Sequence, residues 1–507
     1  MGHKARALGQ SDDVLQKRFD ACNKARAEPQ LRSRHATLRK TVSALDRKMS
    51  EHIDLSLALA RHAVGVRFDE LSQGTVASVK RSLVDAFGVA LAAGTQGQVT
   101  AAFVDLARVS GSGPCRILGH KLSAAPAVAA LVNGAMSHAL DYEDTHDAGL
   151  VHPNGTALPA ALAAAHLRGN VGGAEFITAM AVGADLTCRL GMAMGDDDTP
   201  RGWVIRPLLG TCGAVAAAGR LLGLDAPQMV EAFALAFSQV TCSKGFFGYA
   251  PSHMREIRDG LAAQAAITAV LLASRGVQCY DRPIEGDHGL FAMYTGGRFD
   301  AERLTCGLGH SWEVDKLSFK PWPSCRGTHP FVEAALILRE AHALQAHEIE
   351  QVTVEVSATF GMLCTPAAQK QRPQTANDAK FSIPFTTAAA LVHGQLTLAD
   401  FSAEALAHPE VLALAQRFGC EVRSTGGLED ALRGTLRLSL RDGRTLFQVV
   451  DRPLGDPLRP MSDEQLLDKF IDCAGYATDP LTRAQAQNAA ARIGALETAG
   501  DLSALDL

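Results

Sequence analysis

Apolar residues recur at helical spacing along most of the first 275 residues. Between residues 76 and 93, Val79, Leu83 and Phe87 keep the three- and four-residue steps of one helix face. Dense alanine favours helix formation and lets helix axes approach closely. Further segments of this kind span 125–140, 158–167, 175–194, 212–222, 228–240 and 261–272. The pattern predicts a large all-α domain.

The pattern changes near residue 312. Residues 350–357 alternate between apolar and polar positions, as a half-buried strand does. Segments 434–440 and 445–450 flank Asp442-Gly443, which is typical of a tight hairpin turn. Helical patterns at 329–344 and 384–393 are interspersed, and helical spacing returns at 464–473 and 481–493.

These patterns predict a mostly α protein with a smaller α+β domain. We expect the first part of the large helical domain over 49–312 and an α+β lid domain over 313–457. The C-terminal helices of 458–507 should pack back on the helical domain.

The first 48 residues differ in charge from the rest. They hold 12 Lys and Arg against 5 Asp and Glu, whereas the whole chain of 507 residues has a net charge of −5. No apolar core of a secretory signal is present, and the acids argue against a transit peptide. Residues 1–48 are interpreted as a basic extension, or as upstream sequence before an internal start at Met49. A helical arm that docks on a partner subunit is the alternative.

Composition excludes several classes of protein. The hydrophobic share of 47% excludes a disordered chain, and the slightly acidic balance argues against a dedicated nucleic-acid-binding protein. No uninterrupted apolar run reaches the ~20 residues of a membrane span. The 11 cysteines form no C-x-x-C pair, which argues against a disulfide framework or a cysteine zinc site. We therefore expect a cytoplasmic protein without nucleic-acid or membrane partners.

The densest polar cluster covers residues 138–147 and is followed by His152-Pro153. Four carboxylates within seven residues repel one another unless cations offset them. A metal ion or Lys and Arg side chains could do so, although no H-x-x-H or H-x-x-x-H spacing supports a metal. If the helix continued through the cluster, His138, Asp141 and Thr145 would share a face. A solvated helix end with capping acids is the alternative.

Two further clusters carry cations. The loop 319–330 contains Lys320, Cys325, Arg326 and His329 just before a helix, whose N-terminal N–H groups favour an anion. Cys325 beside Arg326 could be a reactive thiolate or a structural thiol, and His329 a capping or a catalytic group. Residues 252–260 place Arg255 at another helix start, where a merely solvated arginine is equally plausible.

Together, these clusters resemble the MmgE/PrpD family. The resemblance covers nearly the whole chain after Met49. The matching segments are, in chain order, Asp141-Tyr142-Glu143-Asp144-Thr145 with His152-Pro153; Gly210-Thr211 before Leu221-Leu222-Gly223-Leu224; Arg255 five residues before Gly260; Glu285-Gly286; Lys320 before Pro323; and Lys380-Phe381-Ser382 before Pro384.

The resemblance implies an enzyme of small polycarboxylates. The family includes 2-methylcitrate dehydratase, cis-aconitate decarboxylase and an iminodisuccinate epimerase. It implies a helical domain built from both ends of the chain, a lid, a cleft between them and a homodimer. It implies neither a metal nor an organic cofactor.

By position, Asp141, Thr145, His152 and Lys320 match active-site residues of decarboxylase-like members. Three other positions depart from residues often found in the family. Val204 replaces a histidine, Arg255 replaces a lysine, and Cys325 stands where some members have histidine. These departures argue against cis-aconitate decarboxylation and, less strongly, against methylcitrate dehydration.

The predicted mechanism is proton transfer at the carbon next to a carboxylate. We expect Lys320, Arg255 and Arg326 to hold substrate carboxylates, and His152 to move the proton. Asp141 would orient a partner or stabilise the charged imidazole, and Thr145 would hydrogen-bond a substrate oxygen.

A hydro-lyase similar to 2-methylcitrate dehydratase is the leading prediction. The second is an epimerase, in which Cys325 or His329 supplies the base on the opposite face. The third is a family member without catalytic activity.

Overall fold

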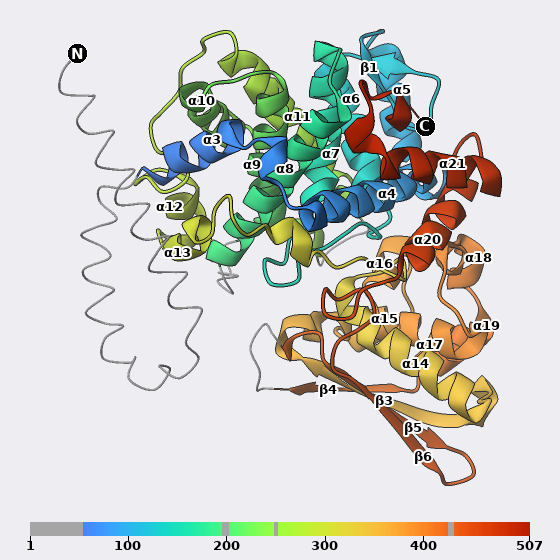
Figure 1. The fold of residues 1–507 in the computed structure, drawn as a ribbon. Coiled ribbons are helices and arrows are strands. Elements are labelled where there is room, and N and C mark those ends of the chain that lie inside the picture. Colours follow the sequence, from blue (N-terminus) through green and yellow to red (C-terminus); the bar gives the residue numbers. More distant parts are fainter. Residues whose placement is uncertain (1–53, 195–201, 248–251, 424–429, 507) are drawn as a thin grey trace, which may run out of the picture.

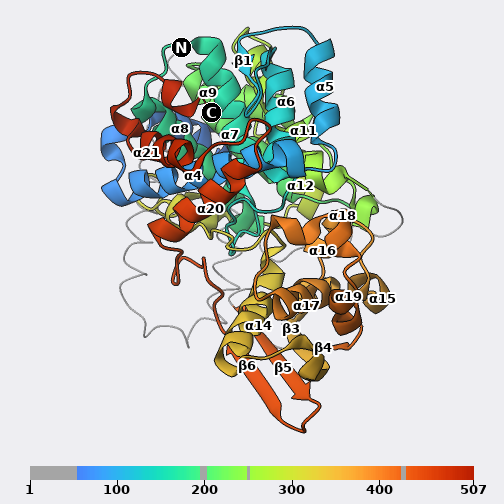
Figure 2. The same ribbon diagram turned by 90° about the vertical axis from the view of Figure 1, so that its right-hand side faces the viewer.

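The computed structural model describes residues 54–194, 202–247, 252–423 and 430–506. The predicted basic extension at 1–48 and the start at Met49 lie outside these residues. The protein is mostly α-helical with a smaller α+β part, as predicted. In both ribbon views the helical part lies above the α+β part (Figures 1 and 2).

The helical part contains every helix that the apolar spacing predicted before residue 275, with ends shifted by up to several residues. Its α-helices are α3 (Leu55–Gly65), α4 (Gln73–Gln96), α5 (Thr100–Val109), α6 (Pro126–His138), α7 (Pro153–Arg168), α8 (Gly173–Met194), α9 (Arg206–Leu221), α10 (Ala226–Phe237), α11 (Met254–Ala273), α12 (Leu290–Thr295) and α13 (Ala301–Thr305). A short hairpin of β1 (Cys115–Arg116) and β2 (Ser123–Ala124) precedes α6.

Helices α6 and α11 touch through glycine. A Cβ atom at Gly134 would lie 2.6 Å from the Cα of Gly260, so neither position has room for a side chain. The close approach lets groups at the end of α6 meet the first turns of α11. His138 Nδ1 consequently lies 3.7 Å from a carboxylate oxygen of Asp259.

The α+β part contains a four-stranded sheet in the order β4-β3-β5-β6. The sequence predicted β3 (Ile349–Ser357) and the hairpin of β5 (Gly434–Leu440) and β6 (Thr445–Val450), which turns at Asp442-Gly443. It did not predict β4 (Phe418–Arg423), which runs parallel to β3 at the sheet edge. Most of β4 is exposed or half-buried, so it lacks an apolar alternation.

Six α-helices of the described residues accompany this sheet, and α14 contacts β5 and β6 while α17 contacts α14. Their bounds are α14 (His329–His342), α15 (Ala367–Gln371), α16 (Ala376–Lys380), α17 (Ile383–His393), α18 (Ala403–Leu406) and α19 (Pro409–Ala415).

The chain then returns to the helical part. Helices α20 (Asp463–Gly475) and α21 (Arg483–Gly494) pack along α4, which Figure 1 shows in red beside blue. Inside this contact, Lys469 Nζ lies 2.6 Å from Oδ1 of Asp85 and donates to the backbone oxygen of Tyr142 at 2.7 Å. Tyr142 belongs to the polar loop after α6, so α20 contacts and stabilises that loop through Lys469.

Helix α8 is long and apolar enough to cross a membrane by length and composition alone. Of its most apolar window, 94% is buried among the other helices. Asp185 and Arg189 pair with each other within this helix and are also buried. Such burial is what the central helix of a folded domain requires.

Candidate active site

A buried loop between α6 and α7 forms the centre of the site. Residues 139–146 are all buried, although the segment includes three carboxylates. Helix α6 ends at His138, and Asp141 adopts a left-handed backbone conformation with φ of 49°. The chain therefore leaves the helix before Asp141. The interpretation that His138, Asp141 and Thr145 share one helix face is wrong.

A backbone contact brings the linker of residues 317–320 against this loop. Thr145 and Ser318 form an antiparallel bridge, with N–O distances of 2.9 and 2.7 Å. Two residues further on, Lys320 donates to the backbone oxygen of Asp141 at 2.7 Å and also to its carboxylate. The sequence predicted both Lys320 and Asp141 for the site. The bridge between Thr145 and Ser318, which are more than 170 positions apart, brings them together.

Arg255, in the first turn of α11, reaches the other side of the same carboxylate. Its Nη2 lies 3.2 Å from Oδ2 of Asp141, and its guanidinium lies 3.6 Å from the ring centre of Phe381. Burial alone would raise the pKa of Asp141, but Lys320 and Arg255 hold it well below its usual value. Asp141 is thus an ionised carboxylate that orients two cations.

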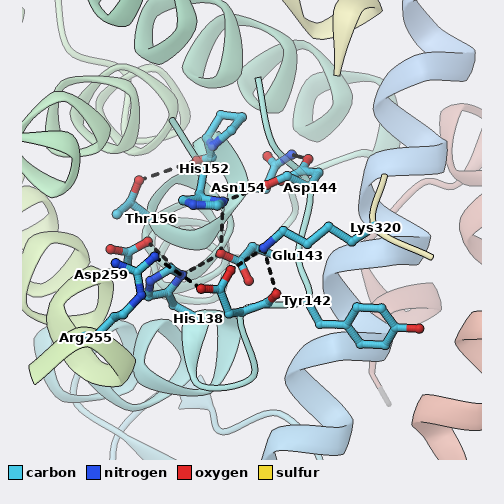
Figure 3. Close-up of polar contacts among 12 residues, drawn as sticks. His138, Tyr142, Glu143, Asp144, His152, Asn154, Thr156, Arg255, Asp259 and Lys320 are labelled. Carbon is cyan, nitrogen blue, oxygen red and sulfur yellow. Dashed lines mark hydrogen bonds and ion pairs between the residues drawn. The ribbon is translucent and has the colours of Figure 1, made fainter. Parts of the chain in front are cut away.

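Glu143 holds two imidazoles. Its Oε1 lies 2.5 Å from Nδ1 of His138 and 3.2 Å from Nδ1 of His152. Nδ1 of His152 also lies 3.2 Å from the backbone oxygen of Asp144. Since both neighbours are acceptors, we assign the proton of His152 to Nδ1 and leave Nε2 with a lone pair. Figure 3 shows the two imidazoles beside Glu143, with Lys320 approaching from the linker.

The electrostatics agree with this arrangement. Burial lowers the pKa of His152 to about 4, although Glu143 opposes the shift, so the imidazole is neutral near pH 7. Burial would raise the pKa of Glu143, but His138, Lys320 and His152 lower it. A neutral base thus lies beside an ionised carboxylate that can stabilise its protonated form.

Asp144 supports the loop from the other side. Its Oδ2 accepts from Ser82 and, at 2.5 Å, from the amide of Asn154. Burial and repulsion by Asp85 raise the pKa of Asp144 to about 7. Asp144 thus links the loop to α4 and to the first turn of α7.

Thr145 contributes a hydroxyl that is buried and has no hydrogen-bond partner among the described residues. Its backbone is fixed by the bridge to Ser318, which lies two residues before Lys320. A buried hydroxyl without a hydrogen-bond partner lowers the stability of the fold unless a ligand supplies that partner.

Arg326 and His329 are engaged elsewhere. Arg326 donates to the backbone oxygens of Leu454 at 2.9 Å and Pro453 at 3.4 Å, and pairs with Asp147. His329 contacts Arg326 and the backbone oxygen of Ser324. Burial and the charge of Arg326 lower the pKa of His329 well below its usual value. These contacts hold the loop to residues 453–454, so we leave both out of the proposed substrate pocket.

Cys325 lies close to the site but is a poor nucleophile. Burial and the charge of Asp141 raise the pKa of its thiol. A neutral thiol is weakly nucleophilic, which favours the structural interpretation of this residue over the reactive one.

The site contains residues that the sequence analysis did not assign. Glu143, His138 and Asp259 lie at its centre, and Lys380 approaches from the α+β part. Glu143 and His138 fall within the polar cluster at 138–147, so the sequence indicated that both lie near the site. It did not predict the contact between them, because that contact depends on where α6 ends.

Three groups could offer atoms to a metal ion. Ligand atoms of Asp141, Glu143 and His152 lie within 4.8 Å of one another. The ammonium of Lys320 already binds Asp141, and Arg255 contacts it from the other side. A divalent cation there would meet two positive charges at short range. The donor set therefore fits a metal poorly.

Models of one protein family match the chain in two parts. The MmgE/PrpD N-terminal domain matches residues 57–302, and the MmgE/PrpD C-terminal domain matches residues 322–493. The chain belongs to the MmgE/PrpD family.

Curated relatives of this family member are lyases. A cis-aconitate decarboxylase-like protein of Aspergillus oryzae is 29% identical over 78% of this chain and 84% of its own length. Cis-aconitate decarboxylase of Aspergillus terreus is 28% identical over 72% and 78%. The Mus musculus enzyme of that name is 25% identical over 80% and 84%. These likenesses support an enzyme of the lyase type.

Val204, which departs from the residue often found in this family, is buried before α9. Its N–H donates to the backbone oxygen of Cys242 at 2.8 Å. An isopropyl group cannot transfer a proton, so this position carries no acid or base here.

Proposed function

We propose that this chain is a cofactor-independent lyase that acts at the carbon next to a carboxylate of a small di- or tricarboxylate. One observation carries the proposal. The neutral imidazole of His152 is fixed through Nδ1, within a buried cluster that also contains Lys320 and Arg255. Such a site combines a proton acceptor with cations for an anionic intermediate.

The main energetic difficulty of the reaction is its anionic intermediate, which the cations of the site can stabilise. A carbanion next to a carboxylate spreads its charge into a dianion, which water stabilises poorly because its dipoles must reorganise. Positive groups fixed in a buried site need no such reorganisation. Lys320 and Arg255 are fixed by Asp141, and Arg255 can pair with a carboxylate through two N–H groups.

His152 is suited to moving the proton. With Nδ1 held by acceptors, Nε2 can take a proton from carbon or, once charged, return one. Carboxylates of a bound substrate would raise the pKa of His152 from about 4 towards neutrality. The hydroxyl of Thr145, which lacks a partner among the described residues, would donate to a substrate oxygen.

Decarboxylation of cis-aconitate is the first reaction to test, because relatives at 25–29% identity carry that activity in their names. The bond to one carboxyl carbon breaks and carbon dioxide leaves. The electron pair stays on the substrate, conjugated with the remaining carboxylates, and protonated His152 supplies the proton.

Dehydration of a hydroxy tricarboxylate such as 2-methylcitrate is the second candidate, because Val204 in place of the family's frequent histidine argues less strongly against dehydration than against decarboxylation. In that case His152 removes the proton from carbon, and the electron pair of that C–H bond forms the new C=C bond as the C–O bond breaks. Protonated His152 then returns the proton to the departing hydroxyl, which leaves as water. Epimerisation needs a second base on the opposite face. Cys325 and His329, the two side chains predicted for that role, do not fit it.

The test is turnover of each substrate in heavy water, followed by NMR. Either carbon dioxide with a deuterated product or loss of the hydroxyl supports the proposal, and His152→Gln should slow that reaction about 10²- to 10⁴-fold. Deuterium exchange without bond cleavage supports the epimerase instead. No exchange, no product and no thermal stabilisation by any polycarboxylate would overturn the enzymatic assignment.

A further inference from the structure

Lys380 ends helix α16 of the α+β part and is buried, with 4% of its surface exposed. No hydrogen bond or ion pair of its ammonium occurs among the described residues. Its Nζ lies over the ring of Phe401, 5.7 Å from the ring centre. A buried cation of this kind costs free energy that an anion would offset.

The backbone places Lys380 at the candidate site. Its carbonyl accepts from the N–H of Cys325 at 3.0 Å, five residues after Lys320. The next residue, Phe381, lies under the guanidinium of Arg255. Lys380 is therefore attached to both segments that carry the other cations.

The charges around Lys380 also indicate that it lies near the candidate site. Burial lowers its pKa to about 8, while Glu256, Asp141 and Glu143 oppose the shift and Lys320 adds to it. Glu256 follows Arg255 on α11, and one of its buried carboxylate oxygens has no hydrogen-bond partner within the described ranges. Lys380 thus senses the Lys320–Asp141 pair electrostatically but is not hydrogen-bonded to it.

The three cations differ in how they are used. Asp141 already binds both Lys320 and Arg255, whereas no carboxylate within the described ranges binds Lys380 directly. A dicarboxylate needs two cationic contacts, and a tricarboxylate needs a third. We propose that Lys380 binds a further carboxylate of the substrate and so makes the site selective for tricarboxylates. This inference rests on the proposed function.

Binding of unreactive ligands tests the inference without turnover. Propane-1,2,3-tricarboxylate and succinate differ by one carboxylate-bearing carbon, and calorimetry gives their dissociation constants. Lys380→Met should weaken binding of the tricarboxylate about 10- to 100-fold, the effect of one charged hydrogen bond, and change succinate binding less than about twofold. Lys380→Arg should retain part of the preference. Lys121→Met, which removes an exposed lysine paired with Asp479, is the control and should change neither.

Equal losses for both ligands, or no loss for either, would overturn the role of Lys380. If the wild-type protein binds neither ligand, the proposed function itself fails. Should Lys380→Met not fold, the wild-type protein is titrated with both ligands from about pH 7 to pH 10. Lys380 loses its charge within this range, while the pKa of Lys320 is raised above its usual 10.5 by Asp141 and Glu143 against burial. Tricarboxylate affinity should then fall more steeply than succinate affinity, and parallel falls would overturn the inference.

Discussion

His138 and His152 contact the same carboxylate oxygen, Oε1 of Glu143, at 2.5 and 3.2 Å. Their ring centres lie 5.2 Å apart. One carboxylate therefore orients two imidazoles, and a proton added to either ring is stabilised by the same charge.

Replacing Glu143 with glutamine should lower kcat about 10²- to 10⁴-fold with a smaller change in KM, since it removes the charge that stabilises protonated His152. Glu143 raises the pKa of His152, so the acidic limb of the pH profile should move to lower pH in Glu143→Gln. Steady-state kinetics across pH check both effects.

The matched control is Glu313→Gln. Glu313 is also buried and also pairs with a histidine, His146 at 3.3 Å, which ends the site loop and contacts neither Glu143 nor His152 among the described residues. An equal loss of activity in this control would mean that Glu143 acts through stability alone.

Replacing Thr145 with valine should raise the free energy of unfolding by about 1 kcal/mol, since burying a hydroxyl that has no partner among the described residues costs free energy. It should lower kcat/KM about tenfold, because one hydrogen bond to substrate is lost. Thr387→Val removes another buried hydroxyl without a described partner, in α17, so it should change the stability similarly but leave kcat/KM unchanged. Unchanged kinetics in Thr145→Val would remove this residue from the mechanism.

Replacing Gly134 with alanine should destabilise the fold by about 1–3 kcal/mol or more, because the new methyl group collides with α11 backbone. Urea unfolding measures the change. Activity should also fall, since separating α6 from α11 moves His138 relative to Asp259. Gly494→Ala, where nothing lies within 4 Å of the added atom, should be neutral or slightly stabilising. Similar stabilities for the two variants would contradict the tight crossing.

Acid should destabilise the protein partly through His62. Burial, followed by Arg189 and Arg220, lowers the pKa of His62 to about 3. Between pH 6.5 and this value the unfolded chain binds a proton that the folded protein does not, so stability falls as pH falls. From pH 7 to pH 5 the loss attributable to His62 is about 2 kcal/mol.

His62→Gln should remove this part of the pH dependence, measured by urea unfolding at both pH values. Asp144 works in the opposite direction, because its pKa is raised to about 7, but it is the same in both proteins. Equal pH slopes in wild type and variant would mean that His62 is not a buried neutral imidazole.

Apolar spacing was enough to predict most of the fold. Segments such as 175–194 carry a period that only a buried helix satisfies, and Asp442-Gly443 specifies its own turn. Strand β4 escaped prediction because it is stabilised by pairing with β3, while its side chains are mostly exposed or half-buried. Backbone pairing leaves little trace in composition.

The site was predictable where chemistry depends on residue type, and not where it depends on contacts across the chain. Asp141, His152, Lys320 and Arg255 were each named, and the structure brings them together. Arg326 was expected to bind substrate, but no local pattern reveals the carbonyl groups of residues 453–454 that receive its donors. Lys380 appeared only as part of a motif, since its burial and its closeness to Arg255 come from the packing of the two parts.

The contact of Lys469 with Asp85 and Tyr142 implies an order of folding events during biosynthesis. A ribosome that has finished the first 312 residues has made an aspartate and an active-site loop whose buried partner does not yet exist. Burying Asp85 alone would leave its charge uncompensated. The loop between α6 and α7 should thus reach its final conformation only after α20 has been synthesised, so the N-terminal half of the chain completes its fold after the C-terminal end is made.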